Sequence, residues 1–565
     1  MICSVINLTI KLEEESSSNI IVRDISFSLE PGVSMGIVGE SGSGKTITAL
    51  SLLKLLPPRM YISDGQIHWQ GSNGLDVDLA VLNEKEIQQI RGRQISMIFQ
   101  EPMTSLNPSL RCGWQIREAV SLHLGESPKR AESQTMQLLK EVQLPADKAF
   151  YNKYPHQLSG GQRQRIMIAM ALAGNPSLLI ADEPTTALDV TVQKKILDLL
   201  DEIRRKRGMS MLFISHDLGV IRQICDNALV MYQGEVVESG RVEDLFENPQ
   251  HSYTRGLISC RPMLGSKPGR LPTLADFLSP GLDAEMADPG TGTGTTTPQE
   301  PQLEEIPLLK VSDLHTRYIL KKSFFGKPLR SLEAVDHVSF YVCQGETLGL
   351  IGESGCGKST LGRTLIGLIR SRKGEIQYRG RSVTQLRGKQ LNEYRQKVQF
   401  IFQDPFSSLN PTLKIGPAIM EVMRVHGIYS GRKQRQEAAL GLLDDVGLPS
   451  GFFNRYPHEF SGGQRQRIVL ARALATGPEL IICDESVSSL DVSVQAQILN
   501  LLNELKDKLK LTYLFISHDL AVVKYMADRI MVMKDGKLVE QGPSDELFRN
   551  PESNYTRELM DSILD

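Results

Sequence analysis

The chain has 565 residues, of which 41% are apolar and 23% are charged, and its formal net charge at pH 7 is -2. This balance is typical of a soluble globular protein and excludes a nucleic-acid or acidic-membrane partner recognised through bulk charge. No apolar run approaches the roughly 18 residues that span a bilayer. The seven cysteines form no C-x-x-C pair, which argues against zinc ribbons and disulfide frameworks.

The first motif along the chain is a glycine-rich turn between a short apolar strand and a helical pattern. It reads GESGSGKT at 39–46 and returns as GESGCGKS at 352–359, so both copies fit G-x-x-x-x-G-K-[ST]. Glycines let successive backbone N–H groups surround an anion, and the following helix N-terminus adds a positive dipole end. We therefore predict two loops that bind the phosphates of ATP, formed by Gly39, Glu40, Ser41, Gly42, Ser43, Gly44, Lys45 and Thr46 and by Gly352, Glu353, Ser354, Gly355, Cys356, Gly357, Lys358 and Ser359.

Within each loop, two side chains have a predicted task of their own. Lys45 and Lys358 are expected to reach the β- and γ-phosphates of ATP. The hydroxyl groups of Thr46 and Ser359 are expected to bind Mg²⁺. The sequence therefore predicts ATP and Mg²⁺ as ligands of both halves of the chain.

Acidic residues end a later apolar strand in each half, in "SLLIADEP" and "ELIICDES". Asp182 and Asp484, at the strand exit, suit a Mg²⁺ ligand shell, and Glu183 and Glu485, one residue farther, suit a base that orients the attacking water. An acidic pair can also be a solvated cap on a strand. Its position after a phosphate loop in both halves favours the catalytic interpretation.

A histidine follows the next apolar strand in each half, after "MSMLFIS" and "LTYLFIS". A histidine at a strand end is usually a surface or capping residue. His216 and His518, however, recur at an unchanged offset (518 - 216 = 302). We therefore predict that each imidazole contacts the γ-phosphate and holds the catalytic base and the water in register.

The chain is a tandem repeat of two units, and the segment that connects them has a different composition. Ser159 matches Ser461 and Glu183 matches Glu485, each 302 residues apart (461 - 159 and 485 - 183). Between the units, residues 265–307 are rich in Gly, Pro, Thr and acidic residues, a composition that cannot bury enough apolar surface to fold alone. We predict a first domain at 1–264, a flexible linker at 265–307 and a second domain at 308–565.

Together these motifs resemble the ATP-binding cassette family of transport ATPases. The resemblance implies an α/β fold with two tandem P-loop NTPase domains, each with a mixed α/β ATPase core, an antiparallel β subdomain and a helical signature subdomain. It adds site residues that the motifs "SGGQ", "TALD" and "SSLD" and the glutamine of "FQ" carry: Gln100, Ser159, Gly160, Gly161, Gln162 and Asp189, and Gln403, Ser461, Gly462, Gly463, Gln464 and Asp491. Gln100 and Gln403 would touch the Mg²⁺ and water region.

The family also implies a head-to-tail pair of cassettes with two ATP molecules between them. On that arrangement Ser461 and Gly463 face the nucleotide held by Lys45, while Ser159 and Gly161 face the one held by Lys358. A serine hydroxyl, exposed glycine N–H groups and a helix N-terminus form an anion receptor. We expect the two cassettes to pair within one chain.

Finer motifs, including "FQEPMTSLNP", "YPHQLSGGQRQR", "SHDL" and a trailing "YTR" in both halves, look like the oligopeptide, dipeptide and nickel importers. This likeness implies an energy-coupling ATPase at the cytoplasmic face of the bacterial inner membrane. Its partners would be two permease subunits and a periplasmic-type solute-binding protein, with no direct contact to nucleic acid. An exporter ATPase, or a soluble twin-cassette factor acting on ribosomes or DNA, is the alternative.

One departure from the family pattern separates the two halves. The family often stacks adenine on an aromatic residue near the start of each cassette, and Tyr318 fits that role in the second half. The matching position of the first half holds Leu12. Loss of base stacking costs roughly 1–3 kcal/mol by analogy with stacked nucleic-acid bases. We therefore predict weaker nucleotide binding at the first site, with hydrolysis at both.

Overall fold

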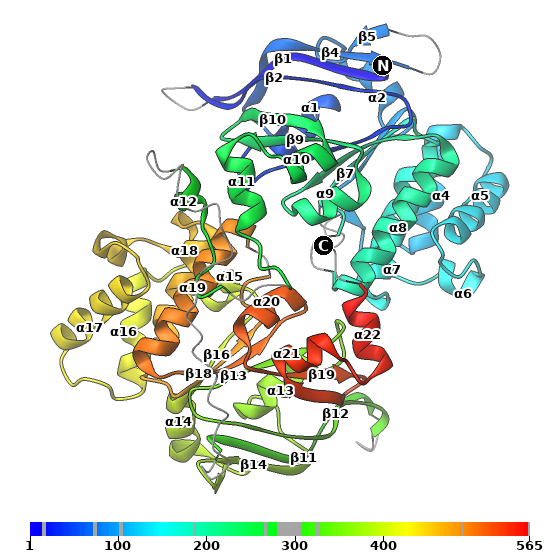
Figure 1. Ribbon diagram of the computed structural model, residues 1–565. Helices are drawn as coiled ribbons and strands as arrows, with labels where there is room; N and C mark the ends of the chain where they lie inside the picture. Colours follow the sequence, from blue (N-terminus) through cyan, green and yellow to red (C-terminus); the bar gives the residue numbers. More distant parts are fainter. Residues whose placement is uncertain are drawn as a thin grey trace. The chain divides into compact units, whose positions relative to one another are not determined.

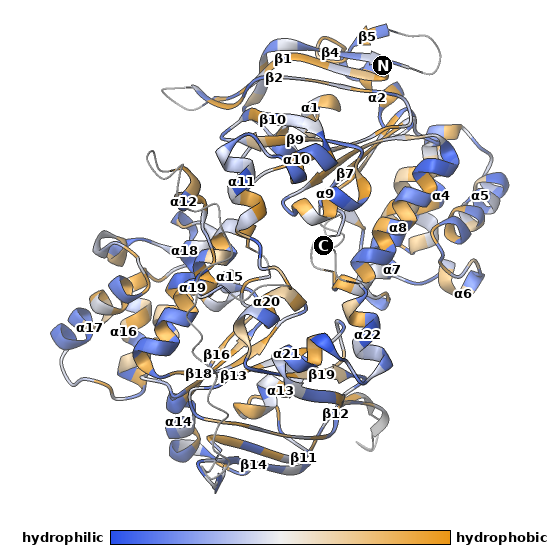
Figure 2. Ribbon diagram, in the orientation of Figure 1, coloured by the Kyte–Doolittle hydropathy of each residue, from blue (hydrophilic) through white to orange (hydrophobic). Residues whose placement is uncertain are grey.

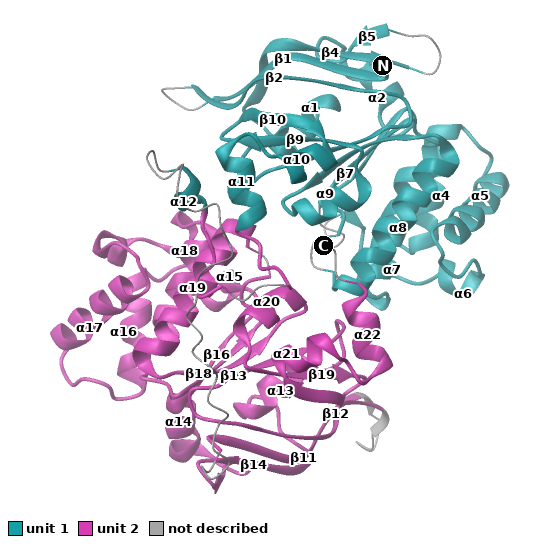
Figure 3. Cartoon of the chain, in the orientation of Figure 1, with its two compact units in different colours: residues 1–259, 274–280, 564–565 teal, residues 260–273, 281–563 magenta. Residues whose placement is uncertain are grey.

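The computed structural model describes residues 1–13, 18–71, 76–100, 105–185, 188–264, 268–278, 307–322, 328–488 and 490–562. The chain divides into two compact units, shown in Figure 3. Unit 1 holds residues 1–259, 274–280 and 564–565, and unit 2 holds residues 260–273 and 281–563. Each unit has the same plan, as the repeat in the sequence predicts.

Unit 1 contains two sheets. The antiparallel sheet has the order β2-β1-β4-β5, made of β1 (Cys3–Glu13), β2 (Ser18–Leu29), β4 (Met60–Gln70) and β5 (Asp76–Asp78). The larger sheet has the order β10-β9-β3-β8-β7-β6, made of β3 (Ser34–Val38), β6 (Ile95–Ile98), β7 (Leu178–Asp182), β8 (Ser210–Ser215), β9 (Asn227–Tyr232) and β10 (Glu235–Arg241). Its strands are parallel except β10, which runs antiparallel to β9.

Most helices of unit 1 lie against the larger sheet or form a separate helical region around α4 and α5, and α12 lies beside α11 (Figure 1). They are α1 (Lys45–Leu52), α2 (Glu84–Ile90), α4 (Cys112–Leu124), α5 (Pro128–Glu141), α6 (Lys148–Tyr151), α7 (Gly160–Ala171), α8 (Val190–Arg207), α9 (Leu218–Ile224), α10 (Val242–Glu247), α11 (Ser252–Ser259) and α12 (Leu274–Leu278).

Unit 2 repeats this architecture. Its antiparallel sheet, in the order β12-β11-β14-β15, contains β11 (Leu309–Lys322), β12 (Pro328–Val342), β14 (Lys373–Tyr378) and β15 (Arg381–Ser382). Its larger sheet, in the order β16-β17-β18-β13-β19-β20, contains β13 (Thr347–Ile351), β16 (Val398–Ile401), β17 (Leu480–Asp484), β18 (Thr512–Ile516), β19 (Arg529–Lys534) and β20 (Lys537–Pro543). Its helices are α13 (Lys358–Leu365), α14 (Gly388–Lys397), α15 (Pro405–Ser408), α16 (Ile415–Val425), α17 (Arg432–Asp445), α18 (Gly462–Leu474), α19 (Val492–Leu509), α20 (Leu520–Met526), α21 (Ser544–Arg549) and α22 (Asn554–Met560).

The core of each unit joins its two sheets. In unit 1, fully buried Leu8 of β1 belongs to the same apolar cluster as Ile37 of β3 and Trp69 of β4. In unit 2, Leu314 and Leu350 share the corresponding cluster. Every residue of the central strands β3 and β13 is buried, which explains why neither strand contains a polar residue after its first position, Ser34 or Thr347. Figure 2 shows the hydrophobic colour on these sheets and the hydrophilic colour on the outer helix α17. The mixed α/β core with an added antiparallel sheet and helical region confirms the predicted fold.

Part of the predicted linker is described. Residues 279–306 lie outside the described residues, but 268–278 do not. The backbone N–H of Leu271 donates to Asn500 Oδ1 over 2.9 Å, and the Leu271 carbonyl accepts from Asn500 Nδ2 over 2.8 Å. Leu271 is buried, and α12 follows three residues later. Apolar residues of "LPTLADFL" are therefore packed, although the average composition of the whole segment predicts a flexible linker.

In the described part of the chain, the helices are too short or too polar for any of them to cross a membrane.

Candidate nucleotide sites

The glycine-rich loop of unit 1 connects β3 to α1. Gly39, Gly42 and Gly44 have φ angles of 155°, 82° and 98°, which only glycine adopts readily. A Cβ atom on Gly39 would lie 2.2 Å from the backbone oxygen of Met231, so the close approach of β9 also requires glycine. The loop of unit 2 has matching φ angles of 149°, 82° and 111° at Gly352, Gly355 and Gly357. The backbone thus holds both loops in the same curled conformation.

The loop lysines are buried and point back into their own loops. Lys45 Nζ donates to the carbonyl oxygens of Gly39 and Glu40 over 2.8 and 2.7 Å. Lys358 Nζ makes the same contacts with Gly352 and Glu353, over 2.6 and 2.9 Å. These bonds place each ammonium group inside the curl of backbone N–H groups, where an anion would meet it.

The hydroxyl group at the start of each helix meets the acid at the end of the neighbouring strand. Thr46 Oγ1 donates to Asp182 Oδ1 over 3.1 Å, and Ser359 Oγ donates to Asp484 Oδ1 over 2.8 Å. Burial raises the pKa of Asp182 to about 6, and the neighbouring Glu183 charge adds to the rise. Burial raises the pKa of Asp484 as well.

This pair of oxygen ligands fits a divalent cation. Asp484 Oδ2 is buried and, among the described residues, has no hydrogen-bond partner. A buried carboxylate oxygen without a partner is costly, and a cation would remove that cost. Hydroxyl and carboxylate oxygens are the ligands that Mg²⁺ prefers. The donor set therefore fits Mg²⁺, and the metal-binding role of Thr46, Asp182, Ser359 and Asp484, like that of Gln100 and Gln403, stays a prediction.

The predicted bases are held by two side chains each. Glu183 Oε2 accepts from Gln100 Nε2 over 2.9 Å, and Glu183 Oε1 lies 3.1 Å from His216 Nδ1. Both contacts come from residues far apart in the sequence, which the order of strands β6, β7 and β8 brings to one edge of the sheet. The sheet therefore fixes the direction of this carboxylate.

Unit 2 places the same residue types around Glu485, but there the glutamine and the histidine both lie at one carboxylate oxygen, Oε2. Gln403 Nε2 donates over 2.8 Å, and His518 Nδ1 lies 3.4 Å from the carboxylate. Burial acts to raise the pKa of Glu485, but His518 and Lys358 outweigh it and hold the pKa below its usual value. Glu485 and its counterpart Glu183 have φ angles of 48° and 44°, a strained conformation for a glutamate that costs of order 1–3 kcal/mol. Strain of this kind is typical of functional sites.

The signature residues stand at the start of a helix in each unit. Ser159 Oγ accepts from the backbone N–H of Gln162 over 3.3 Å, and Gln162 Oε1 accepts from the backbone N–H of Ser159 over 3.2 Å. Ser461 and Gln464 form the same reciprocal cap on α18. This cap defines the N-terminus of the helix and leaves Gly160 and Gly462 in its first turn.

The second glycine of each signature allows the following helix to pack closely. A Cβ atom on Gly161 would lie 2.7 Å from Val192 Cγ1, and one on Gly463 would lie 2.2 Å from Val494 Cγ1. Asp189 caps α8 by accepting from the backbone N–H of Val192 over 2.9 Å, and Asp491 stands at the corresponding position before α19. In Figure 1, α7 and α1 stand apart within unit 1. The structure thus groups the signature with Asp189, on a part of the unit separate from its own loop.

The two units differ beside the loop helix. The hydroxyl of Tyr318 lies 3.4 Å from Thr360 Oγ1 at the start of α13, and 37% of the Tyr318 residue is exposed. Its ring is therefore available for stacking next to the phosphate loop. In unit 1 the matching residues are Leu12 and Ile47, which offer neither ring nor hydroxyl.

A tyrosine that sequence reasoning did not place in the site completes each loop. The hydroxyl of Tyr253 accepts from the backbone N–H of Glu40 over 3.0 Å, and that of Tyr555 accepts from Glu353 over 3.1 Å. Both tyrosines are buried. The sequence signal was the "YTR" motif, whose fixed offset of 302 (555 - 253) indicated importance but not a partner more than 200 residues away.

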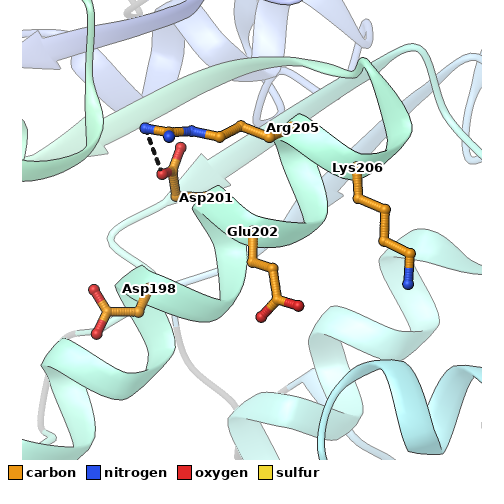
Figure 4. Close-up of a pocket in the computed structure, with 5 residues that line it drawn as sticks. All are labelled: Asp198, Asp201, Glu202, Arg205 and Lys206. Carbon is orange, nitrogen blue, oxygen red and sulfur yellow. Dashed lines mark ion pairs between the residues drawn. The ribbon is translucent and has the colours of Figure 1, made fainter.

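A surface hollow on α8 lies outside these residues (Figure 4). Figure 4 shows Arg205 folded back toward Asp201, with the two paired over 2.9 Å. Such an i,i+4 pair stabilises a solvent-facing helix surface. We assign no ligand to this hollow, because its lining is the charged surface of one helix, with three acidic residues followed by two basic ones: Asp198, Asp201, Glu202, Arg205 and Lys206.

Two protein families match the chain, each of them twice. Residues 22–186 and 335–488 match the family described as ABC transporter. Residues 237–280 and 539–565 match the family described as oligopeptide/dipeptide transporter, C-terminal region. The second family covers the tyrosines that contact the phosphate loops.

Two relatives match this chain over its whole length and over most of their own. The glutathione import ATP-binding protein GsiA of Escherichia coli (strain K12) is 45% identical over 565 residues, covering 100% of this chain and 89% of the relative. The GsiA protein of Salmonella typhimurium (strain LT2) is 45% identical over 564 residues with the same coverage. A solved dimer of the ATP-binding cassette MJ0796 bound to ADP and Pi is 27% identical and covers 42% of this chain and 98% of its own, with a TM-score of 0.38.

The duplicated loops and acid pairs lie in the same two halves of the chain as the family matches, and the relatives match the chain throughout. This chain therefore belongs to the ABC transporter family and carries two of its ATP-hydrolysing cassettes.

Proposed function

We propose that this chain is the energy-coupling ATPase of an importer for peptides or peptide-like solutes. The observation that carries the proposal is the joint repetition of a complete nucleotide site and an oligopeptide/dipeptide C-terminal region in each half. The curated relatives named above, which import glutathione by their printed names, support a peptide-like cargo. The transported solute itself would be recognised by other subunits.

The binding step follows from the loop geometry. The backbone N–H groups of each loop and the buried ammonium of Lys45 or Lys358 would surround the phosphates of ATP. Thr46 and Asp182, with Gln100 nearby, would hold Mg²⁺ at the first site, and Ser359, Asp484 and Gln403 would hold it at the second. When bound, this ion neutralises charge on the phosphoryl oxygens.

The hydrolytic step is assigned to Glu183 and Glu485. Gln100 and His216 each contact a different oxygen of Glu183, so the carboxylate has a fixed direction toward an attacking water. The lowered pKa of Glu485, which His518 and Lys358 cause against the effect of burial, keeps that group ionised at neutral pH. A carboxylate of low pKa is a weak base, so its main contribution is to orient the water.

The signature residues are proposed to serve the opposite cassette. Ser159 and Gly161, at the N-terminus of α7, would face the nucleotide of Lys358. Ser461 and Gly463, at the N-terminus of α18, would face that of Lys45. Capped helix N-termini with exposed N–H groups suit an anion. ATP would then act as a ligand that favours the closed pair, and hydrolysis would remove that preference.

Two membrane permease subunits and a periplasmic-type binding protein are the proposed partners, at the cytoplasmic face of the inner membrane. The test is purification of the tagged chain from its native membranes, with uptake of labelled glutathione and dipeptides measured in parallel. We expect permeases to co-purify and uptake to require the chain. Sedimentation with ribosomes alone would contradict the proposal, and solute accumulation on loss of the chain would identify an exporter.

A matched pair of variants links hydrolysis to transport. The double variant Glu183→Gln/Glu485→Gln is expected to bind ATP and permeases but to lose hydrolysis roughly 10²–10⁴-fold, the usual contribution of a positioned acid–base group. Uptake should fall with it. Glu202→Gln, an exposed change on α8, serves as the control and should leave both rates unchanged.

A further inference from the structure

A histidine and carboxylate cluster lies on the antiparallel sheet of unit 2. Asp313 and His315 belong to β11, and His337 belongs to the paired strand β12. Each residue offers one ligand atom, and the three atoms all lie within 4.8 Å of one another. The cluster has no part in the nucleotide contacts described above.

The chemistry of the cluster matches a borderline transition metal. His337 Nδ1 lies 2.6 Å from Asp313 Oδ1, and His315 Nε2 lies 3.3 Å from the same oxygen. Two imidazoles and one carboxylate are a donor set for Zn²⁺ and its neighbours, whereas Mg²⁺ and Ca²⁺ prefer oxygen ligands alone. Three protein ligands would leave a fourth position for water.

A second carboxylate orients the buried histidine. His315 Nδ1 lies 3.2 Å from Asp336 Oδ1, and Asp336 Oδ2 lies 3.4 Å from Lys537 Nζ. A carboxylate on the far nitrogen is the usual support of a metal-binding histidine. If His315 Nδ1 donates a hydrogen bond to Asp336, His315 Nε2 carries a lone pair. This lone pair then lies opposite a lone pair of Asp313 Oδ1. Only a positive species between them, a second proton or a metal ion, removes that repulsion.

The cluster has one buried residue, His315, and two residues that are open to solvent, Asp313 and His337. His315 is buried, so its ring direction is fixed by packing. The side chains of Asp313 and His337 are 61% and 68% exposed, so an ion can reach them from solvent. Register shifts in the β11–β12 ladder between Val311 and Leu314 and between Leu314 and Thr316 bring these residues together.

Unit 1 has the same backbone without the donors. Asn7 and Asp24 have φ angles of 52° and 48°, close to the 47° and 54° of Asp313 and His337. The ladder register places Thr9 where unit 2 has His315, and the backbone N–H of Asp24 donates to Thr9 Oγ1 over 3.1 Å. The histidines are therefore not needed to build this irregular pair of strands, because its counterpart forms with other residues.

We propose that Asp313, His315 and His337 form a binding site for a zinc-class divalent ion, with Asp336 as the residue that orients His315. The bound ion links β11 to β12. Tyr318 lies on the same strand, three residues after His315. The bound ion therefore steadies the part of the antiparallel sheet that flanks the second phosphate loop. The proposal is independent of the proposed transport function, because its test requires no turnover.

The test is a Zn²⁺ titration of the untagged, chelator-stripped full chain against a chromophoric competitor. The double variant His315→Gln/His337→Gln is expected to bind one equivalent fewer than the natural sequence, and Asp336→Asn to bind it roughly 10–100-fold more weakly. Millimolar Mg²⁺ should not displace the ion. Co²⁺ in its place should give visible bands typical of nitrogen and oxygen ligands, without a thiolate charge-transfer band.

Unit 1 provides the matched gain of function. The quadruple variant Asn7→Asp/Thr9→His/Arg23→Asp/Asp24→His copies the cluster and should gain one equivalent of Zn²⁺. His337→Gln alone, at an exposed position, should keep the metal-free thermal transition of the natural chain and thus separate metal loss from misfolding. Equal zinc stoichiometry in the natural chain and in His315→Gln/His337→Gln would overturn the proposal and assign the cluster to a protonated histidine between carboxylates.

Discussion

The two cassettes are nearly identical where phosphate chemistry takes place and differ where the base of the nucleotide would lie. Lysine, hydroxyl, aspartate and glutamine make the same contacts in both units. The histidine contacts Oε1 of the glutamate in unit 1 and Oε2 in unit 2. Beside the loop helix, unit 2 has Tyr318 and Thr360 at the positions where unit 1 has Leu12 and Ile47. Phosphate contacts therefore depend on one backbone shape, whereas contact with a flat base can be gained or lost through single side chains.

Substitution of the signature serines, which should change hydrolysis more than any other variant below, tests whether the two sites are built from both cassettes. Ser159→Arg should slow hydrolysis at the site of Lys358, and Ser461→Arg should slow it at the site of Lys45, by roughly 10²–10³-fold, as for loss of an anion-stabilising donor. Single-turnover hydrolysis is measured with the other lysine changed to alanine. If each substitution disables only the cassette that carries it, the swapped arrangement is wrong.

A second prediction concerns pH and compares the buried aspartates. The folded-state pKa of Asp182 is about 6 because of burial, above the ordinary 3.8, so the folded chain binds a proton more tightly than the unfolded chain. Stability without Mg²⁺ should therefore fall as pH rises from 4 to 7, by up to about 3 kcal/mol from this residue.

The measurement is urea unfolding of the metal-free chain at several pH values. Asp182→Asn should flatten the pH dependence of the unfolding free energy for unit 1. Asp484→Asn should do the same for unit 2, because the pKa of Asp484 is also raised. Addition of Mg²⁺ and ATP should restore stability at pH 7, because the ionised carboxylates then have a cation. A pH dependence unchanged in both variants would contradict the assignment.

A third prediction sharpens the difference at the base. Nucleotide binding at the second site, measured in Lys45→Ala, should be tighter than at the first, measured in Lys358→Ala, by roughly 1–3 kcal/mol. Tyr318→Leu should remove the difference, and Leu12→Tyr should reduce it. Equal ATP affinities in the two lysine variants would show that base stacking does not separate the sites.

The smallest expected effect concerns the tyrosine contacts. Tyr253→Phe and Tyr555→Phe each leave a loop N–H without its phenol acceptor, which should weaken ATP binding by about 1 kcal/mol. The neighbours differ, since Tyr253 packs against Tyr232 and Tyr555 lies under Lys534. Isothermal titration should show the same loss in both units if the hydrogen bond is responsible. A loss in one unit alone would assign the effect to the neighbour instead.

Local sequence signals predicted the order of strand, loop and helix because each signal lies within a few residues of the structure it produces. The glycines of 39–46 and the acid at the end of "SLLIAD" are examples. The tyrosine contact was not predictable, because 213 residues separate Tyr253 from Glu40. The His315 and His337 cluster depends on a strand register that alternation of residue types does not reveal. Leu271 was missed because composition was averaged over the whole segment.

The phenol contacts of the phosphate loops also have a consequence for biosynthesis. A ribosome makes Gly39 to Thr46 long before Tyr253, and Gly352 to Ser359 long before Tyr555. Each loop therefore acquires its last hydrogen bond only when the C-terminal region of its own cassette has been made and packed. A nascent or prematurely terminated cassette that stops before this tyrosine contains the loop lysine, the acid pair and the signature, yet its loop lacks one support. Completion of the ATP site is in this way coupled to completion of translation of each cassette.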